Sequence, residues 1–132
     1  MNAAIAYQET AVTTQTKGGL IVLLYDGAIC FLKKAGQCIG QEDIAGRNRN
    51  IGRARNIIFE LNSTLDLDRG GSVAQNLRSL YNFIWRYLGD ANIKNDTRML
   101  KEIIAILDNL RQGWEEITRH TQSTRLPKSR AL

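Results

Sequence analysis

Residues 20–35 read LIVLLYDGAICFLKKA, and the spacing of the apolar side chains in this stretch decides the fold class. Apolar residues recur there at intervals of three and four, the period of an α-helix with one buried face. The pattern extends outward to predict a helix over about 17–39, with a stripe of Leu20, Leu24, Gly27, Phe31 and Ala35 that Leu23 and Leu32 widen. The mostly apolar run carries Asp26 and is shorter than the roughly 20 residues that cross a bilayer. We therefore expect a core helix and no membrane insertion.

Three further segments show the same helical period. They predict helices over about 43–65, 72–91 and 96–119, whose stripes include Ile44, Ile51 and Ile58, then Leu77, Ile84 and Leu88, then Ile103, Leu107, Trp114 and Ile117. The links between them are only a few residues long, which makes neighbouring helices antiparallel. The predicted fold class is all-α, an antiparallel up-down four-helix bundle.

Capping signals support two of the helix starts. Ser72, with Gln75 three residues later, fits a capping box that follows a breaker cluster at 68–71. Either Asn95 or Asp96 is suited to cap the last helix, because a short polar side chain can accept a hydrogen bond from the first free N–H groups.

The chain has 132 residues, which predicts one domain with one core. Residues 1–16 hold only a short apolar patch among Thr and Gln residues, so we expect a mobile N-terminal segment before a bundle at 17–119. The net charge is +5, and four of these charges lie in residues 119–132. We expect a basic flexible tail over 120–132 and a nearly neutral body.

The two cysteines are predicted to be reduced thiols. Cys30 and Cys38 are eight residues apart on one predicted helix, which places their Cα atoms about 12 Å apart. A disulfide needs less than about 7 Å. Residues 1–10 also lack the basic and apolar regions of a signal peptide, so we expect a cytoplasmic protein.

Catalytic chemistry finds little support in the sequence. His120 is the only histidine and lies in the expected tail, so we expect no histidine-based triad and no two-histidine zinc site. The glycine pairs at 18–19 and 70–71 match no phosphate-binding loop or dinucleotide fingerprint. We expect no enzyme, no catalytic residues, no metal and no cofactor.

The pair Tyr25-Asp26 in the middle of the first predicted helix is more informative. An aspartate buried without a partner is costly, so Asp26 must either reach the surface or make a specific hydrogen bond. Tyr81, Trp85 and Tyr87 follow on the third helix. These aromatic residues either fill the core and its rim or line an apolar groove into which a partner segment docks.

Several spaced elements together resemble the family of flagellar secretion chaperones called FliS. They are LIVLLYDGAICFLKKA at 20–35, STLDLDRGGSVAQNLRSLYNFIWRYLGDANIKND at 63–96 and LDNLRQGW at 107–114. The resemblance covers nearly the whole chain up to about Ile117. It rests on the combination of these elements, since no one of them would suffice.

The resemblance implies an antiparallel four-helix bundle with a short N-terminal segment that caps one end. Members of the family bind the C-terminal segment of newly made flagellin, which is disordered alone and partly helical in the hydrophobic grooves of the bundle, where it displaces the cap. They keep flagellin from polymerising in the cytoplasm and help deliver it to the export apparatus, a component of which is a further candidate partner. They use no nucleotide.

Carried over position by position, the resemblance assigns Ala6-Tyr7 and Val12 to the displaceable cap, together with Ile5 of the same apolar patch. Tyr25 and Asp26 match the LYDGA motif. Asn76, Tyr81 and Asn92 match later polar and aromatic positions of the family. The candidate partner-binding residues are therefore Ile5, Tyr7, Val12, Tyr25, Asp26, Asn76, Tyr81 and Asn92. Which of them contact the client and which hold the bundle together stays open.

Two other classes of function stay open beside the chaperone. A nucleic-acid-binding bundle would use the basic face of the second helix, formed by Arg47, Arg49, Arg53 and Arg55. The leading interpretation treats this face as solvated and expects no nucleic-acid partner. A purely structural oligomer would pair the same apolar patches between two copies, and the sequence does not give the oligomeric state.

Overall fold

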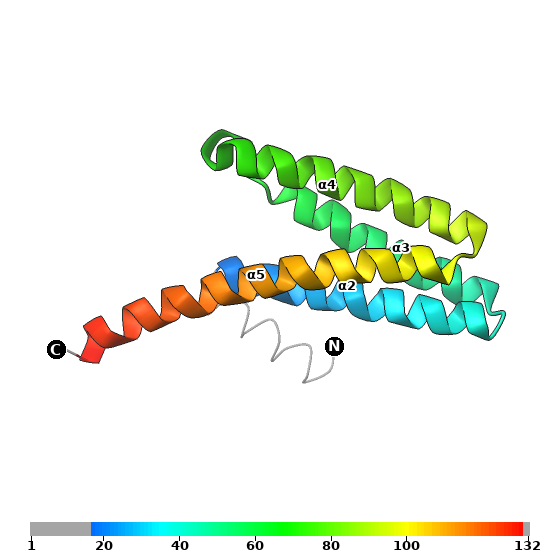
Figure 1. Ribbon diagram of the computed structural model, residues 1–132, viewed down its shortest axis with the longest axis horizontal. Coiled ribbons are helices and arrows are strands. Elements are labelled where there is room, and N and C mark those ends of the chain that lie inside the picture. The colour runs from blue at the N-terminus through cyan, green and yellow to red at the C-terminus, as the bar shows by residue number, and fades with distance from the viewer. Residues whose placement is uncertain (1–16, 131–132) are drawn as a thin grey trace, which may run out of the picture.

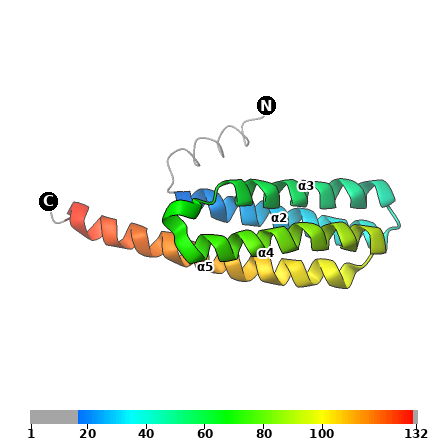
Figure 2. The same cartoon turned by 90° about the horizontal axis from the view of Figure 1, so that it is seen from above.

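The computed structural model describes residues 17–130, with side-chain surroundings given for residues 18–120. Four helices make up this part: α2 (Lys17–Gly40), α3 (Ile44–Ser63), α4 (Leu67–Lys94) and α5 (Thr97–Arg130). Consecutive helices run in opposite directions (Figure 1) and lie side by side in a second view (Figure 2). The predicted all-α four-helix bundle is confirmed. The predicted cap segment at 1–16 lies outside the described residues.

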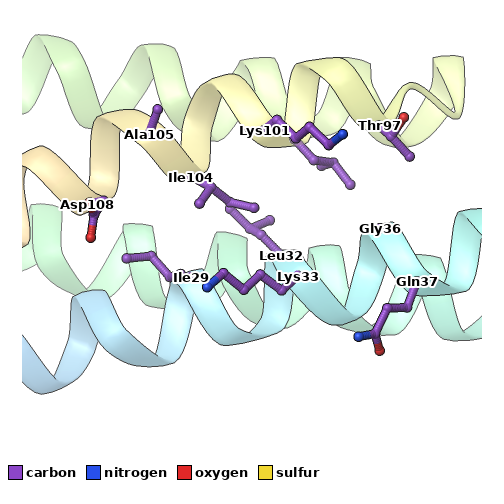
Figure 3. A pocket seen from close by; sticks show the side chains of 11 residues that line it. Ile29, Leu32, Lys33, Gly36, Gln37, Thr97, Lys101, Ile104, Ala105 and Asp108 are labelled. Carbon is purple, nitrogen blue, oxygen red and sulfur yellow. The ribbon is translucent and has the colours of Figure 1, made fainter.

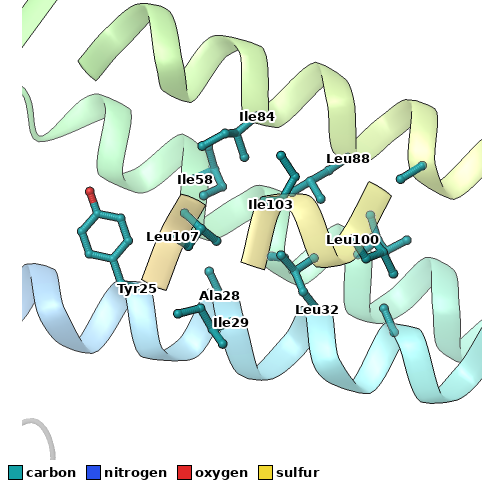
Figure 4. Close-up of a cluster of buried hydrophobic side chains, with 14 of the residues drawn as sticks. Tyr25, Ala28, Ile29, Leu32, Ile58, Ile84, Leu88, Leu100, Ile103 and Leu107 are labelled. Carbon is teal, nitrogen blue, oxygen red and sulfur yellow. The ribbon is translucent and has the colours of Figure 1, made fainter. Parts of the chain in front are cut away.

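Each helix buries one stripe in a common core. Packing joins α2 to α3 and α5, and joins α4 to α3 and, less extensively, to α5. Figure 4 shows the buried side chains meeting between the helices, among them Leu32, Ile58, Ile84 and Leu107, all of which are 0–1% exposed. The predicted stripes are thus buried along most of the bundle. Leu23, Ile44 and Ile117 are exceptions to the predicted stripes, being 38%, 62% and 59% exposed.

Gly27 lets α2 and α3 approach each other closely. A Cβ atom placed on this residue would lie 3.2 Å from Cδ1 of Ile57 in α3, which is tighter than an ordinary contact. The absence of a side chain at Gly27 therefore permits the close packing of α2 on α3.

The start of α4 differs from the prediction. The helix begins at Leu67 and is capped by Asp66, whose side chain accepts a hydrogen bond from the Arg69 backbone N–H at 3.1 Å, so Ser72 does not begin it. The breaker cluster supplies one helical turn and then a kink at Gly71, where φ is 56° and ψ is −135°. This conformation strongly favours glycine. Residues 68–71 therefore redirect the helix instead of preceding it.

Both residues proposed for the last cap are used, each for a different helix. Asn95 ends α4 in the left-handed conformation with φ 57°, and Asp96 accepts hydrogen bonds from the backbone N–H groups of Arg98 at 2.9 Å and Met99 at 3.4 Å. Helix α5 continues to Arg130, past the predicted end at residue 119, and runs beyond the other three helices (Figure 1). The apolar stripe marks where α5 packs, not where it ends. The division into a bundle at 17–119 and a tail at 120–132 stays a prediction.

Candidate functional site

A groove of about 710 Å³ runs between the first and last helices and is called here the α2–α5 groove. Its floor is aliphatic, formed by Ile29 and Leu32 of α2 and by Leu100 and Ile104 of α5. Figure 3 shows these two helices with the labelled side chains of the lining, to which Lys33, Gly36, Gln37, Thr97, Lys101, Ala105 and Asp108 also belong. A long apolar floor between two helices is suited to the apolar face of an amphipathic segment.

Small and charged residues shape the edges of the α2–α5 groove. A Cβ atom on Gly36 would meet nothing within 4 Å, so the space above this residue is open. Lys33 and Lys101 stand on opposite helices, and both are exposed. Asp108 is the acidic residue among the described lining. The edges can therefore attract carboxylates of a bound segment while the floor takes its apolar side chains.

Arg111 ties α2 to α5 beyond one end of this groove. Its guanidinium donates hydrogen bonds to Asp108 at 2.8 Å and to Glu115 at 2.9 Å on α5, and it lies 3.5 Å from the carboxylate of Asp26 on α2. The hydrogen bond from Arg111 lowers the pKa of the Asp108 carboxyl, and the same pairing raises the pKa of Arg111. Asp26 thus reaches the surface and also gains a partner.

A second, smaller groove of about 380 Å³ lies between the two middle helices and is called here the α3–α4 groove. Its floor contains Ile58 and Tyr81, and its walls carry Phe59 and Trp85, which are 67% and 41% exposed. Asn62, Asn82 and Arg86 complete the lining. The amide of Asn62 donates to Asn82 at 2.9 Å, while its own buried carbonyl oxygen has no hydrogen-bond partner. This groove is aromatic where the α2–α5 groove is aliphatic.

Arg55 fixes one wall of the α3–α4 groove. Its guanidinium lies 3.6 Å from the centre of the Trp85 ring, and its Nε–H donates to the Trp85 backbone carbonyl at 2.9 Å. The absence of a side chain at Gly89 leaves room for this contact, because a Cβ atom there would lie 3.0 Å from the guanidinium. A cation on an indole face contributes about 0.5–1 kcal/mol at an exposed position.

Tyr25 and Tyr81 meet inside the bundle. Their hydroxyl groups share a hydrogen bond across the core between α2 and α4, and the side chains are 0% and 2% exposed. Burial raises the pKa of Tyr25, although hydrogen bonds with Tyr81 and Trp114 act in the opposite direction. Burial and the hydrogen bond with Tyr25 also raise the pKa of Tyr81. Of the two, Tyr81 forms part of a groove surface.

The other predicted site residues are dispersed. Asn92, near the end of α4, accepts a hydrogen bond at 2.7 Å from Nε of Arg47, near the start of α3, whereas Asn76 is exposed on α4. The predicted residues Ile5, Tyr7 and Val12 lie outside the described residues. The structure brings Tyr25 and Tyr81 together, and it does not gather the described candidates on one surface. Their roles in partner binding stay predictions.

Sequence reasoning missed the residues that give each groove its character, namely Lys33 and Lys101 in one and Phe59 and Arg86 in the other. One signal was available for Phe59, because a large aromatic residue directly after the stripe residue Ile58 must point away from the core. The lysines gave no signal, since single charges on exposed helix faces are common.

The basic face of the second helix is divided by the fold. Arg47 donates to Asn92 and Asn95, and Arg55 is held by Trp85. Arg49 is exposed, and Arg53 lies over the Phe31 ring at 5.6 Å. The four arginines therefore do not form one continuous surface for phosphate groups.

The described residues hold no cluster of three or more potential metal-ligating side chains. Cys30 and Cys38 are free thiols, as predicted. Across the same part of the chain, no helix has a stretch both long and apolar enough to span a membrane.

The fold and its grooves place the chain among helical-bundle proteins that present apolar surfaces between helices. Residues 1–121 match the model of the family described as flagellar protein FliS, so the chain belongs to the FliS family. It is 38% identical over 115 residues to the flagellar secretion chaperone FliS of Bacillus subtilis (strain 168), covering 87% of this chain and 85% of the relative. These findings support an export-chaperone role.

Two other relatives show the same likeness. The flagellar secretion chaperone FliSB of Pseudomonas aeruginosa PAO1 is 35% identical over 122 residues, which cover 89% of this chain and 97% of the relative. The flagellar secretion chaperone FliS of Salmonella typhimurium (strain LT2) is 34% identical over 111 residues, which cover 83% of this chain and 82% of the relative. The similarity thus extends over most of each protein.

Proposed function

We propose that this chain is a cytoplasmic chaperone that binds the C-terminal segment of flagellin, prevents its premature polymerisation and assists its delivery to the export apparatus. The observation that carries this proposal is the α2–α5 groove, whose aliphatic floor of Ile29, Leu32, Leu100 and Ile104 suits the apolar face of an amphipathic client. Membership of the FliS family supports the same role.

The physical logic is coupled folding and binding. A segment that is disordered alone loses conformational entropy when it becomes helical, and burial of its apolar face offsets this cost at about 25 cal/mol per Å². The exposed lysines at the groove edges add attraction for client carboxylates, while the apolar floor supplies most of the affinity. Binding should therefore depend only weakly on salt.

The tyrosines contribute to this function from inside the bundle. Tyr25 is fully buried and Tyr81 forms part of the α3–α4 groove, so their hydrogen bond holds α2 and α4 in the positions that shape both grooves. All eight candidates remain proposed partner-binding residues on the family resemblance: Ile5, Tyr7, Val12, Tyr25, Asp26, Asn76, Tyr81 and Asn92.

Calorimetric titration with a peptide of roughly the last forty residues of flagellin from the same cell tests the proposal, with one-to-one binding and a negative heat-capacity change expected. Gly36→Phe should fill the open space of the α2–α5 groove and weaken binding by about tenfold or more, or at least 1.4 kcal/mol. Gly113→Phe is the matched control, because this exposed glycine also has open space and lies outside both grooves.

Two outcomes would contradict the proposal. If the flagellin peptide did not bind the wild-type chain, flagellin would not be its client. Equal affinity of the Gly36→Phe and Gly113→Phe variants, with helical circular dichroism unchanged, would place the client somewhere other than the α2–α5 groove.

A further inference from the structure

The α3–α4 groove has features that the proposed client site does not explain. Phe59 on α3 and Trp85 on α4 stand on its two walls and are 67% and 41% exposed. Large aromatic side chains beside a groove are typical of the central contacts in protein interfaces. Leaving two of them in water is unfavourable unless another surface covers them.

The charge on this face is positive. The seven described residues that line the groove include the cation Arg86 and no carboxylate. Arg78, Asn82 and Arg86 follow one another at intervals of four on α4, so they share a face of the helix. Arg55 adds a further cation beside Trp85. A neighbouring hollow, which Trp85 and Arg86 also line, contains one acidic residue, Asp90. A carboxylate-bearing partner therefore complements this surface.

The charge also disfavours a second copy as the occupant. A two-fold contact through this groove would place the same residues against themselves, so Arg78 and Arg86 of one copy would face the same cations of the other. Like charges brought together at an interface are strongly unfavourable. The partner must differ from this chain.

The contact between Arg55 and Trp85 favours a helix over a nucleic acid. Stacking of bases needs open aromatic faces, and the Arg55 guanidinium already covers one face of Trp85 at 3.6 Å. The groove between two helices, with Ile58 and Tyr81 below, instead has the shape that takes side chains of a third helix.

We propose that the α3–α4 groove docks an acidic amphipathic helix of a second protein partner, distinct from the client. One large apolar side chain of this helix inserts between Phe59 and Trp85. Carboxylates one turn before and one turn after it face Arg78 and Arg86, whose Cα atoms lie about 12 Å apart along α4. The recognised pattern is thus acid, apolar, acid at intervals of four. Because the α2–α5 groove stays free, the client and this partner bind together.

A designed probe tests the proposal. It is a labelled helical peptide of about 20 residues with one Phe flanked by Glu four residues away on each side. Its control carries Lys in place of both Glu residues. Fluorescence anisotropy with the full chain should show tighter binding of the Glu peptide by about tenfold or more, equivalent to 1.4 kcal/mol.

Variants of the chain locate the contact. Arg86→Glu and Phe59→Ser should each weaken the Glu peptide by about tenfold. The matched controls are Lys101→Glu in the other groove and Phe83→Ser, an aromatic on α4 that is 43% exposed and outside the α3–α4 groove. Neither control should change the affinity for the Glu peptide. All four substituted residues are exposed, so the variants should keep the fold, and circular dichroism checks this.

Three results would overturn the proposal: equal affinity for the Glu and Lys peptides, loss of binding in Lys101→Glu instead of Arg86→Glu, or displacement of the Glu peptide by the flagellin segment. A single-stranded oligonucleotide that binds more tightly than the peptide, with steep salt dependence, would assign the face to nucleic acid and also overturn it. Failure of flagellin to bind the wild-type chain contradicts only the client function, because the Glu peptide is scored independently.

Discussion

The α2–α5 groove and the α3–α4 groove arise from the same kind of amphipathic helix, yet they offer different surfaces. The first measures about 710 Å³, has an aliphatic floor and carries exposed lysines at its edges. The second measures about 380 Å³ and has aromatic walls, one of them fixed by Arg55. The buried stripes build both floors alike, so the residues beside the stripes decide what each groove can bind.

Shortening one floor residue of each groove should give the largest loss of stability. Similar losses at the two positions would show that both floors belong to one core. Leu100 of the α2–α5 groove and Ile58 of the α3–α4 groove are each 1% exposed. Leu100→Ala and Ile58→Ala should each lower the free energy of unfolding by about 2–5 kcal/mol, because both leave a cavity. Urea denaturation monitored by circular dichroism measures this.

Ile93→Ala is the control for this pair, since Ile93 is 84% exposed and its truncation should cost less than about 0.5 kcal/mol. If Leu100→Ala and Ile58→Ala differed by several kcal/mol, the two grooves would rest on unequal packing. The comparison would then have to include stability as well as surface chemistry.

Part of the floors was predictable from the sequence, whereas the edges were not. Leu32 and Ile58 could be assigned to the core because apolar residues at helical spacing are buried together, whereas Ile29 and Ile104 lie outside the predicted stripes. The sequence did not show which seams remain open, since this depends on how α2 meets α5 and how α3 meets α4 in three dimensions. The kink at Gly71 was also missed, because a glycine pair is read as a break whether it ends a helix or redirects it.

The site residues show the same limit. Matching to the family motif selected Tyr25 and Tyr81 without showing that their hydroxyl groups meet across the core, 56 residues apart in sequence. Asp26 was correctly expected to need water or a partner, but Arg111 as that partner follows only from the packing of α5 on α2. Long-range pairs of this kind have no local sequence signal.

The buried tyrosine pair links the helices of the two grooves, and its removal is the second largest expected effect. Tyr25→Phe or Tyr81→Phe leaves the other hydroxyl without this partner and should lower the free energy of unfolding by about 1–3 kcal/mol. The double variant should cost less than the sum of the two single variants, because it removes both hydroxyl groups of the pair. Urea denaturation of the wild type and the three variants gives a double-mutant cycle. If the two single losses of unfolding free energy simply added up in the double variant, the tyrosines would not be coupled.

The same pair gives the bundle a stability that falls at high pH. The pKa values of Tyr25 and Tyr81 are raised from the ordinary value of 10.0, so the folded state keeps protons that the unfolded state loses. Stability from the pair is therefore complete below pH 10 and declines above it, by up to about 1.4 kcal/mol per pH unit for each retained proton. Denaturation at pH 9 and pH 11 measures this decline.

The Tyr25→Phe/Tyr81→Phe double variant is the reference for the pH series. Tyr87 also has a raised pKa because of its hydrogen bond with Glu102, and this contribution remains in the variant. The difference in slope between the wild type and the double variant isolates the buried pair. Identical slopes would mean that the pair does not retain its protons above pH 10.

The smallest expected effect on stability comes from Asp26, for which two roles are open. The family resemblance assigns Asp26 to partner binding, and the structure places its carboxylate 3.5 Å from the guanidinium of Arg111. The Asp26 side chain is 51% exposed and Arg111 keeps Asp108 and Glu115, so Asp26→Asn should lower the free energy of unfolding by less than about 0.5 kcal/mol. Glu115→Gln is the matched control, because it removes another carboxylate from Arg111. If Asp26→Asn weakens flagellin binding about tenfold while Glu115→Gln does not, the Asp26 carboxylate contacts the client directly and the binding surface extends past the α2–α5 groove. Equal affinities in calorimetry would limit Asp26 to joining α2 and α5.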